Sequence, residues 1–138
     1  MKNSKLYHLS TVNHDGETFI PRVPLDAYYG GEYENRTTKR VCFSKTITGA
    51  CLALNFYGGY DVMYVHVPCD IDSINPKKIY ETTNDDVFDG EFCEEVWIKQ
   101  KVKVKCIGKI RVGYNEYDYH DFRKWRPKVH FKYLERYE

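Results

Sequence analysis

Apolar and basic side chains alternate strictly from residue 102 to residue 107, in the run Val-Lys-Val-Lys-Cys-Ile. A period of two sends one set of side chains into a core and the other into water, which is typical of a half-buried strand. Other short runs rich in β-branched and aromatic residues lie at 5–9, 40–43, 60–67 and 94–98. The sequence therefore predicts a fold dominated by short strands, and residues 110–112 are expected to continue the last of them.

One main helix is expected, at about residues 46–57. Its apolar face is formed by residues at spacings of three and four, namely Ile47, Ala50, Cys51 and Leu54. Ser44 is the expected N-cap. The connections 13–35 and 70–90 carry Pro, Gly and Asn-Asp punctuation and are expected to be irregular. Together these elements predict the α+β class.

Length and charge limit the organisation of the chain and its partners. With 138 residues the sequence fits a single domain, with a core at about 4–112 and an extension at about 114–138. The formal net charge of +1 gives no whole-molecule attraction to nucleic acid or membrane. No apolar run approaches the roughly 20 residues that span a bilayer, and the first residues lack the apolar stretch of a secretory signal. We expect a cytoplasmic protein with no membrane partner.

The five cysteines contain no CxxC pair, and an odd number cannot close completely into disulfides. We expect reduced thiols. Cys51 and Cys106 have apolar neighbours and are expected to pack in the core. The histidines are not spaced near the cysteines in a ligand pattern, so no metal site is expected.

Two basic segments leave alternatives open. Lys101, Lys103 and Lys105 either line a solvated sheet face or form a patch for an anionic ligand. Aromatic and basic residues interleave in the segment 114–138, which is typical of single-stranded nucleic acid binders, although acidic residues are mixed among them. The alternative for this segment is a hairpin or strand that packs on the core.

Three short segments point to a specific chemistry. They are Leu6–Ser10, Arg40–Ser44 leading into the expected helix, and Glu94–Ile98. In order and context they resemble the three-part signature of the ADP-ribosyltransferase superfamily, in its histidine–tyrosine–glutamate branch. The resemblance implies two small antiparallel or mixed sheets forming a cleft, NAD⁺ as the substrate and no metal. Likeness to small phage and bacterial members implies a protein of the host, or nucleic acid, as acceptor, and then the host cytoplasm as location.

The resemblance also implies roles for the first segment. His8 would hydrogen-bond the nicotinamide ribose, and the backbone of Leu9 would hold the carboxamide. Leu9 stands where the family has glycine. Ser10 matches the small hydroxyl position.

In the second and third segments the resemblance implies the ring-binding and catalytic groups. Cys42 aligns with the family's stacking tyrosine, so the ring would come from Phe43, Phe56 or Tyr57, with Ser44 beside it. Glu95 would be the catalytic carboxylate, which holds a ribose hydroxyl and stabilises positive charge on the sugar. Strand alternation sends Glu94 and Glu95 to opposite faces, so one of them enters the site. Arg40, at the start of the second segment, directly precedes the residues expected to line the cleft and is a candidate clamp for the pyrophosphate.

Two hypotheses follow from the resemblance, and a third follows from the C-terminal segment 114–138. The first is a mono-ADP-ribosyltransferase-like enzyme. The second is a non-catalytic nucleotide-binding or protein-interaction module of the same fold, of anti-defence type, which the departures at Leu9 and Cys42 favour. The third is an interaction module that uses the segment 114–138 on nucleic acid or another protein.

Overall fold

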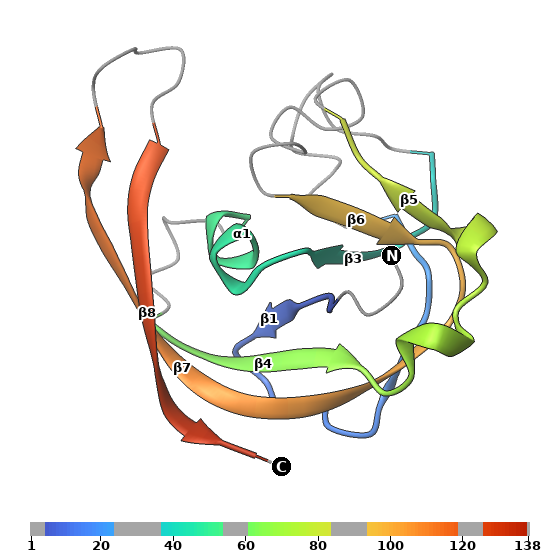
Figure 1. Cartoon of the computed structure of the whole chain (residues 1–138), viewed down its shortest axis with the longest axis horizontal. Helices are drawn as coiled ribbons and strands as arrows, with labels where there is room; N and C mark the ends of the chain where they lie inside the picture. Colours follow the sequence, from blue (N-terminus) through green and yellow to red (C-terminus); the bar gives the residue numbers. More distant parts are fainter. Residues whose placement is uncertain (1–4, 24–36, 54–60, 84–93, 119–125, 138) are drawn as a thin grey trace.

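The computed structural model describes residues 5–23, 37–53, 61–83, 94–118 and 126–137. These ranges form two sheets of antiparallel strands with one short α-helix (Figure 1), which confirms the predicted α+β class. The larger sheet has the order β1-β4-β7-β2, and β8 pairs with the C-terminal part of β7. The smaller sheet has the order β3-β6-β5. The larger sheet consists of β1 (His8–Ser10), β2 (Thr18–Phe19), β4 (Val62–Pro68), β7 (Val102–Asp118) and β8 (Arg126–Arg136). The smaller consists of β3 (Val41–Ser44), β5 (Ile79–Glu81) and β6 (Glu95–Ile98).

Backbone hydrogen bonds join the two sheets at two places in the described residues: Arg22 pairs with Arg40, next to β2 and β3, and Tyr7 pairs with Ser44. Tyr7 N–H donates to the Ser44 carbonyl over 2.8 Å, and Ser44 N–H donates to the Tyr7 carbonyl over 2.9 Å. Ser44 in turn pairs with Glu95 across β3 and β6. The three segments that carry the family resemblance are therefore neighbours in space, in the order β1, β3, β6.

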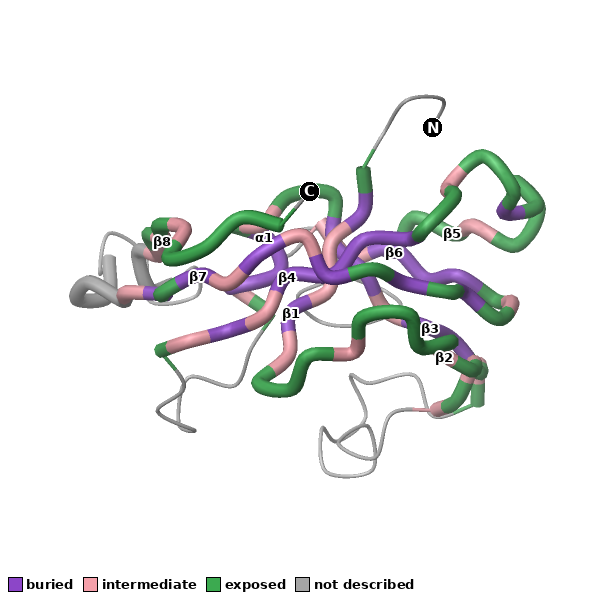
Figure 2. The backbone as a smooth tube through the Cα atoms, turned by 90° about the horizontal axis from the view of Figure 1, so that it is seen from below, coloured by how far each residue is buried: buried purple, intermediate pink, exposed green. Residues whose placement is uncertain are grey.

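Two apolar cores lie against the sheets, and buried residues run along β4 and β6 (Figure 2). The first core is built from Leu6, Val41, Phe43, Ile74, Val96, Ile98, Val102 and Val104. The second is built from Leu9, Ala50, Cys51, Met63, Val65, Ile110 and Val112. Leu6 and Leu9 differ in parity along one chain segment, so strand alternation sends them into different cores. Cys51 and Cys106 are buried and unpaired, as predicted.

The C-terminal segment forms a long hairpin with the end of β7, which confirms the structural alternative for this part of the chain. Phe131 and Tyr133 of β8 pack against the second core. Gly108 of β7 permits this packing, because a Cβ there would lie 2.8 Å from the Tyr133 ring and 2.6 Å from the Glu135 carbonyl oxygen. The exposed side chains of Lys101, Lys103 and Lys105 also follow the predicted alternation.

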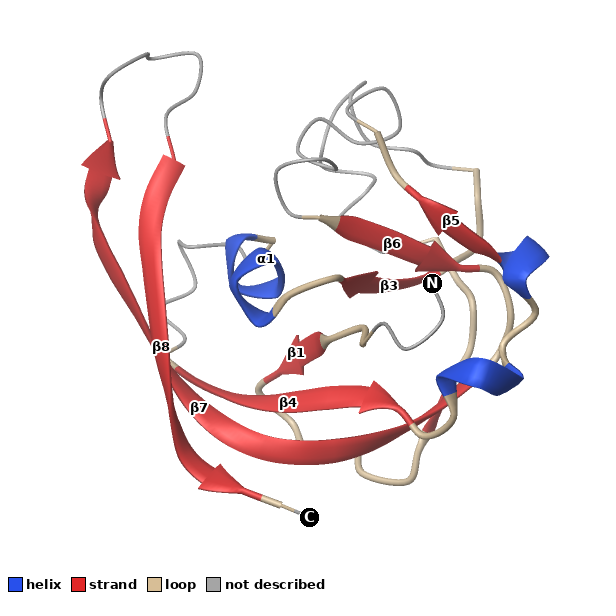
Figure 3. Ribbon diagram, viewed as in Figure 1, coloured by secondary structure: helices blue, strands red, loops and turns tan. Residues whose placement is uncertain are grey.

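Three local expectations were wrong. The helix α1 (Ile47–Leu52) is capped by Thr46, whose Oγ1 accepts from Gly49 N–H over 2.9 Å, because the predicted cap Ser44 is the last residue of β3. Short strands occur in both connections expected to be irregular, β2 in 13–35 and β5 in 70–90. Each has two or three residues, too few to show a period of two. Figure 3 shows α1, which contacts β1, β3 and β8. It also shows the two 3₁₀ turns Ile71–Ser73 and Pro76–Lys78, which lie between β4 and β5 in the chain.

Among the described residues, no helix has both the length and the apolar character needed to cross a membrane.

Candidate functional site

The smaller sheet has one apolar face and one polar and aromatic face. Val41 pairs with Ile98 and Phe43 with Val96, and these four side chains belong to the first core. The alternate residues point the other way, so that one row runs Cys42, Trp97, Tyr80 across the three strands and the next row contains Ser44 and Glu95. We call these five residues, with Arg40, the Trp97 face.

Trp97 holds this face together. Its side chain is 1% exposed, and its Nε1–H donates to Glu95 Oε2 over 3.1 Å. The guanidinium carbon of Arg40 lies 4.2 Å from the centre of the indole, within the range of a cation–π contact. The Tyr80 ring lies 5.8 Å from the indole at an angle of 41°. One indole therefore contacts a carboxylate, a cation and a second ring.

The Glu95 position is fixed from both its backbone and its side chain. Thr82 donates to the Glu95 carbonyl through its N–H at 3.1 Å and its hydroxyl at 2.9 Å. The half-buried carboxylate is oriented by the indole N–H of Trp97. These contacts restrict the Glu95 carboxylate to one orientation.

Glu94 lies in the turn before β6 and is directed elsewhere. It has a φ of 53°, a left-handed conformation uncommon for residues other than glycine. Its carboxylate accepts from the Thr46 hydroxyl over 2.6 Å, at the start of α1, and its carbonyl accepts from Lys45 N–H over 3.1 Å. Glu95 alone of the two lies on the Trp97 face.

Arg40 belongs to the Trp97 face but is buried. Its side chain is 3% exposed, and its Nη1–H donates to the Thr38 carbonyl over 2.9 Å. A guanidinium stacked on an indole and bonded to backbone stiffens the sheet. The structure thus presents Arg40 as a buried support of Trp97 rather than as an exposed phosphate clamp.

His8 lies on the opposite side from Glu95. Tyr7 shares a row with Ser44 and Glu95, so alternation sends the next side chain, His8, to the face of the first core. The His8 Nδ1 lies 3.2 Å from the Cys42 carbonyl oxygen, which can only accept, so Nδ1 carries the proton. Burial lowers the pKa of His8 below its usual value, and the bond to Cys42 opposes that shift.

The other predicted site residues are dispersed. Leu9 packs in the second core, and Phe43 in the first. Ser10 Oγ accepts from Val12 N–H over 3.1 Å and lies 3.2 Å from His14 Nε2. Phe56 and Tyr57 lie outside the described residues. The structure therefore brings Arg40, Ser44 and Glu95 to one face and places His8, Leu9, Ser10 and Phe43 elsewhere.

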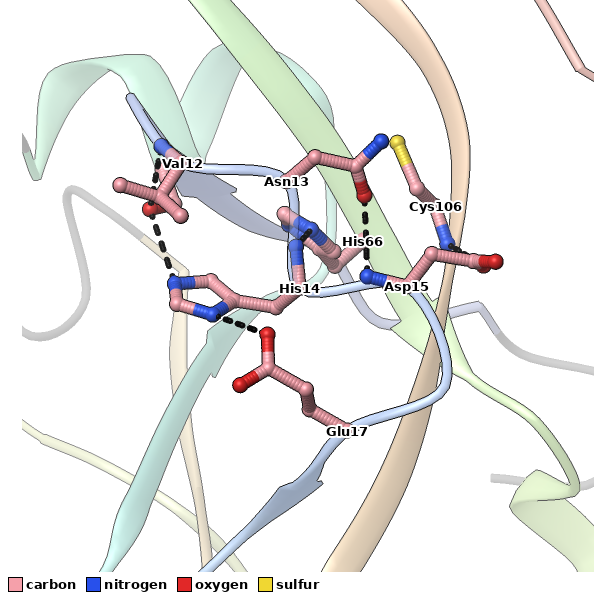
Figure 4. Close-up of polar contacts among 8 residues, drawn as sticks. Val12, Asn13, His14, Asp15, Glu17, His66 and Cys106 are labelled. Atoms are coloured by element: carbon pink, nitrogen blue, oxygen red, sulfur yellow. Dashed lines mark hydrogen bonds and ion pairs between the residues drawn. The ribbon is translucent and has the colours of Figure 1, made fainter.

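His8 belongs to a second polar group, the histidine cluster of His8, His14 and His66. The ring of His66 lies 6.1 Å from that of His8 and 5.4 Å from that of His14, and the Phe19 ring packs beside all three. His66 is fully buried, and its Nε2 accepts from His14 N–H over 2.8 Å (Figure 4). Burial, with His8 nearby, lowers the pKa of His66 to about 4, although the His8 backbone raises it in part. The His66 ring is therefore neutral at pH 7.

The segment 11–17 closes the histidine cluster. Asp15 Oδ1 accepts from Cys106 N–H over 2.9 Å, and Gly16 N–H donates to the Val104 carbonyl over 2.9 Å (Figure 4 shows the first of these bonds). On the outer side, His14 Nδ1 lies 2.7 Å from Glu17 Oε2. Segment 11–17 thus brings His14 next to His66 and is itself hydrogen-bonded to β7.

Sequence reasoning missed the two aromatic residues of the Trp97 face. Trp97 had a usable signal, since it follows Glu95 by two residues in a strand and so must share its face. Tyr80 had no such signal, because β5 was not predicted.

In the part of the chain that the structure describes, no group of three His, Cys, Asp or Glu side chains could hold a metal ion. Comparison with family models, curated proteins and solved structures finds nothing that matches this chain.

Proposed function

We propose that the chain is an ADP-ribosyltransferase-like protein that binds NAD⁺ or a related nucleotide on the Trp97 face and retains it without transfer. The observation that carries the proposal is the Glu95 carboxylate, held by the Trp97 indole and flanked by Ser44 in the neighbouring strand. The adjacency of β1, β3 and β6 supports it as well, because the family resemblance rests on these three strands.

The Trp97 face has the groups that a nucleotide needs. An ionised carboxylate accepts hydrogen bonds and donates none, so it can accept one from each of the two hydroxyls of a ribose. Lys99 is exposed just after β6, at the spacing of two that continues the series of Glu95 and Trp97, and can neutralise phosphate.

Retention rather than transfer is favoured by the position of His8. In the family, by resemblance, an imidazole and a carboxylate hold the same ribose. Here the imidazole faces the first core and is engaged by the Cys42 carbonyl. Without that second group, the sugar is less firmly oriented for cleavage of its glycosidic bond.

Transfer to a protein or nucleic-acid acceptor is the second candidate, and the placement of Glu95 favours it. In that reaction the bond between ribose C1′ and the nicotinamide nitrogen breaks, nicotinamide leaves with the bonding electrons, and the acceptor forms the new bond to C1′. The Glu95 carboxylate would stabilise the positive charge on the sugar in the transition state.

Isothermal titration with NAD⁺, combined with turnover of labelled NAD⁺, tests both candidates. We expect the wild-type protein to bind, and Glu95→Gln to weaken binding by roughly 10- to 100-fold, the loss typical of a hydrogen bond to a charged group. Asp72→Asn removes an exposed carboxylate in a 3₁₀ turn and should leave binding unchanged. Release of nicotinamide by the wild-type protein, lost in Glu95→Gln, would select transfer. A wild-type protein that binds neither NAD⁺ nor ADP-ribose would eliminate both.

A further inference from the structure

We infer that Ser10 and His14 form a catalytic site for acyl transfer, in which Glu17 positions His14 and Ser10 attacks the carbonyl carbon of a small ester. This activity is separate from the proposed nucleotide binding, because the three residues lie at the end of β1 and in segment 11–17 rather than on the Trp97 face. The observation that carries the inference is an unbroken series of hydrogen bonds from a hydroxyl through an imidazole to a carboxylate.

These hydrogen bonds fix which atom of each group carries the proton. His14 Nδ1 lies 2.7 Å from Glu17 Oε2, and an ionised carboxylate only accepts, so Nδ1 carries the proton (Figure 4). In the neutral ring Nε2 is then an acceptor. It lies 3.2 Å from Ser10 Oγ, so the hydroxyl donates to it. A serine that donates to an imidazole, itself oriented by a carboxylate, is the arrangement that activates serine as a nucleophile.

The backbone holds the three residues in place independently of their side chains. Ser10 is the last residue of β1, and His14 N–H donates to the buried His66 Nε2 over 2.8 Å. Glu17 N–H donates to the His14 carbonyl over 2.9 Å, and the Glu17 carbonyl accepts from Val104 N–H over 2.9 Å. The site is therefore preorganised by the fold, and substitutions of the three side chains leave these backbone bonds in place.

The surroundings of Ser10 favour an ester of a short aliphatic acid. Ser10 is half-buried, and the two residues after it are exposed, so a small substrate can reach the hydroxyl. Val12 is 56% exposed although it is apolar, and its N–H donates to Ser10 Oγ over 3.1 Å. Apolar surface thus lies next to the nucleophile, where a short acyl chain can cover it.

The reaction has two steps. In the first, Ser10 Oγ bonds to the carbonyl carbon, its proton passes to His14 Nε2, and that proton then goes to the alcohol that leaves as the ester C–O bond breaks. In the second, His14 takes a proton from water, the water oxygen bonds to the acyl carbon, and the carboxylic acid leaves while Ser10 regains its proton. Val12 N–H is already bonded to Ser10 Oγ and does not also hold the oxyanion, so we expect slow turnover.

Two reagents test the site. The first is a fluorophosphonate probe, from which an activated serine displaces fluoride at phosphorus, and the second is p-nitrophenyl acetate. The variants are Ser10→Ala, His14→Gln, Glu17→Gln and the double variant of the last two. Ser73→Ala is the matched control, because Ser73 is an exposed serine whose hydroxyl donates to the Asp70 carbonyl over 2.8 Å. Peptide mass spectrometry locates the label, and thermal unfolding confirms that each variant folds.

We expect the probe to label wild type and Ser73→Ala equally, at Ser10, and to leave Ser10→Ala unlabelled. His14→Gln should slow labelling by about 100-fold or more, because a general base contributes about 10²- to 10⁴-fold. Glu17→Gln should slow labelling by about 10-fold or more, since the amide can donate to Nδ1 and so leave the proton on Nε2. The double variant should be no slower than His14→Gln, because Glu17 acts only through His14.

Three outcomes would overturn the inference. One is equal labelling of Ser10 in wild type and His14→Gln, since the hydroxyl would then not be activated by the imidazole. Another is release of nitrophenol by Ser10→Ala at the wild-type rate, because another group would then be the nucleophile. The third is a wild-type protein that the probe does not label. If Ser10→Ala does not fold, the His14→Gln comparison decides, because that variant keeps every backbone bond of the segment.

Discussion

The Trp97 face and the histidine cluster are both built from aromatic and ionisable side chains, yet they differ in what closes them. In the histidine cluster the segment 11–17 crosses over His66 and uses its Nε2 as an acceptor. On the Trp97 face the buried indole holds groups that still reach the surface, namely the half-buried Glu95 and the exposed Tyr80. In the described residues, segment 11–17 thus covers His66 in one region, whereas in the other Glu95 and Tyr80 keep exposed surface.

The largest expected effect concerns the indole at the centre of the Trp97 face. Trp97→Ala should lower the free energy of unfolding by about 3–5 kcal/mol, because it leaves a cavity and removes the support of Arg40, Tyr80 and Glu95. The free energy of unfolding of a whole domain is about 5–15 kcal/mol, so this loss is a large part of the total. Urea unfolding measures the change.

Trp97→Phe sharpens the same point. It keeps a ring for Arg40 and Tyr80 but removes the Nε1–H that orients Glu95, so it should cost less stability than Trp97→Ala and still weaken NAD⁺ binding. A Trp97→Ala variant as stable as wild type would show that the indole does not organise this face.

The next effect is the pH dependence of the histidine cluster. Because the folded pKa of His66, about 4, lies below its ordinary value of 6.5, the unfolded chain binds the proton more tightly than the folded one. The stability that depends on neutral His66 is complete above pH 6.5 and falls as the pH drops from 6.5 to about 4, by roughly 3 kcal/mol in all. His8 shifts in the same direction and adds to the loss.

Urea unfolding between pH 4 and pH 7 measures this dependence, and His66→Gln is the matched variant. The glutamine amide oxygen can still accept from His14 N–H but does not titrate. Its stability should therefore change less with pH than that of wild type. Identical pH profiles for the two proteins would show that His66 does not close the cluster through its neutral form.

The smallest effect concerns Glu94, at the end of the Trp97 face. Glu94→Ala loses the bond to the Thr46 hydroxyl and keeps the left-handed backbone, whereas Glu94→Gly loses the bond and relieves the backbone. We expect Glu94→Gly to be more stable than Glu94→Ala by about 1 kcal/mol, although glycine ordinarily lowers stability by making the unfolded chain more flexible. Thermal unfolding distinguishes them, and the reverse order would contradict the strain at this position.

Much of the fold could be predicted from local pattern. The alternation at 102–107 and the β-branched run at 60–67 are long enough to show a period of two, and both are strands, β7 and β4. β2 and β5 could not be predicted, because two or three residues have no measurable period and pair only where a longer strand offers an edge. The site was predictable in part for the same reason, since Glu95 and Trp97 share one strand whereas Tyr80 lies on β5.

By itself, the sequence determined the class of the fold and the buried thiols of Cys51 and Cys106, because alternation and apolar spacing are local properties. Only the tertiary structure decided that His8 faces a core and that Tyr80 completes a row with Trp97. Those facts depend on which strands pair and on the register of the pairing. Register is fixed by contacts between residues far apart in the chain, which no local pattern contains.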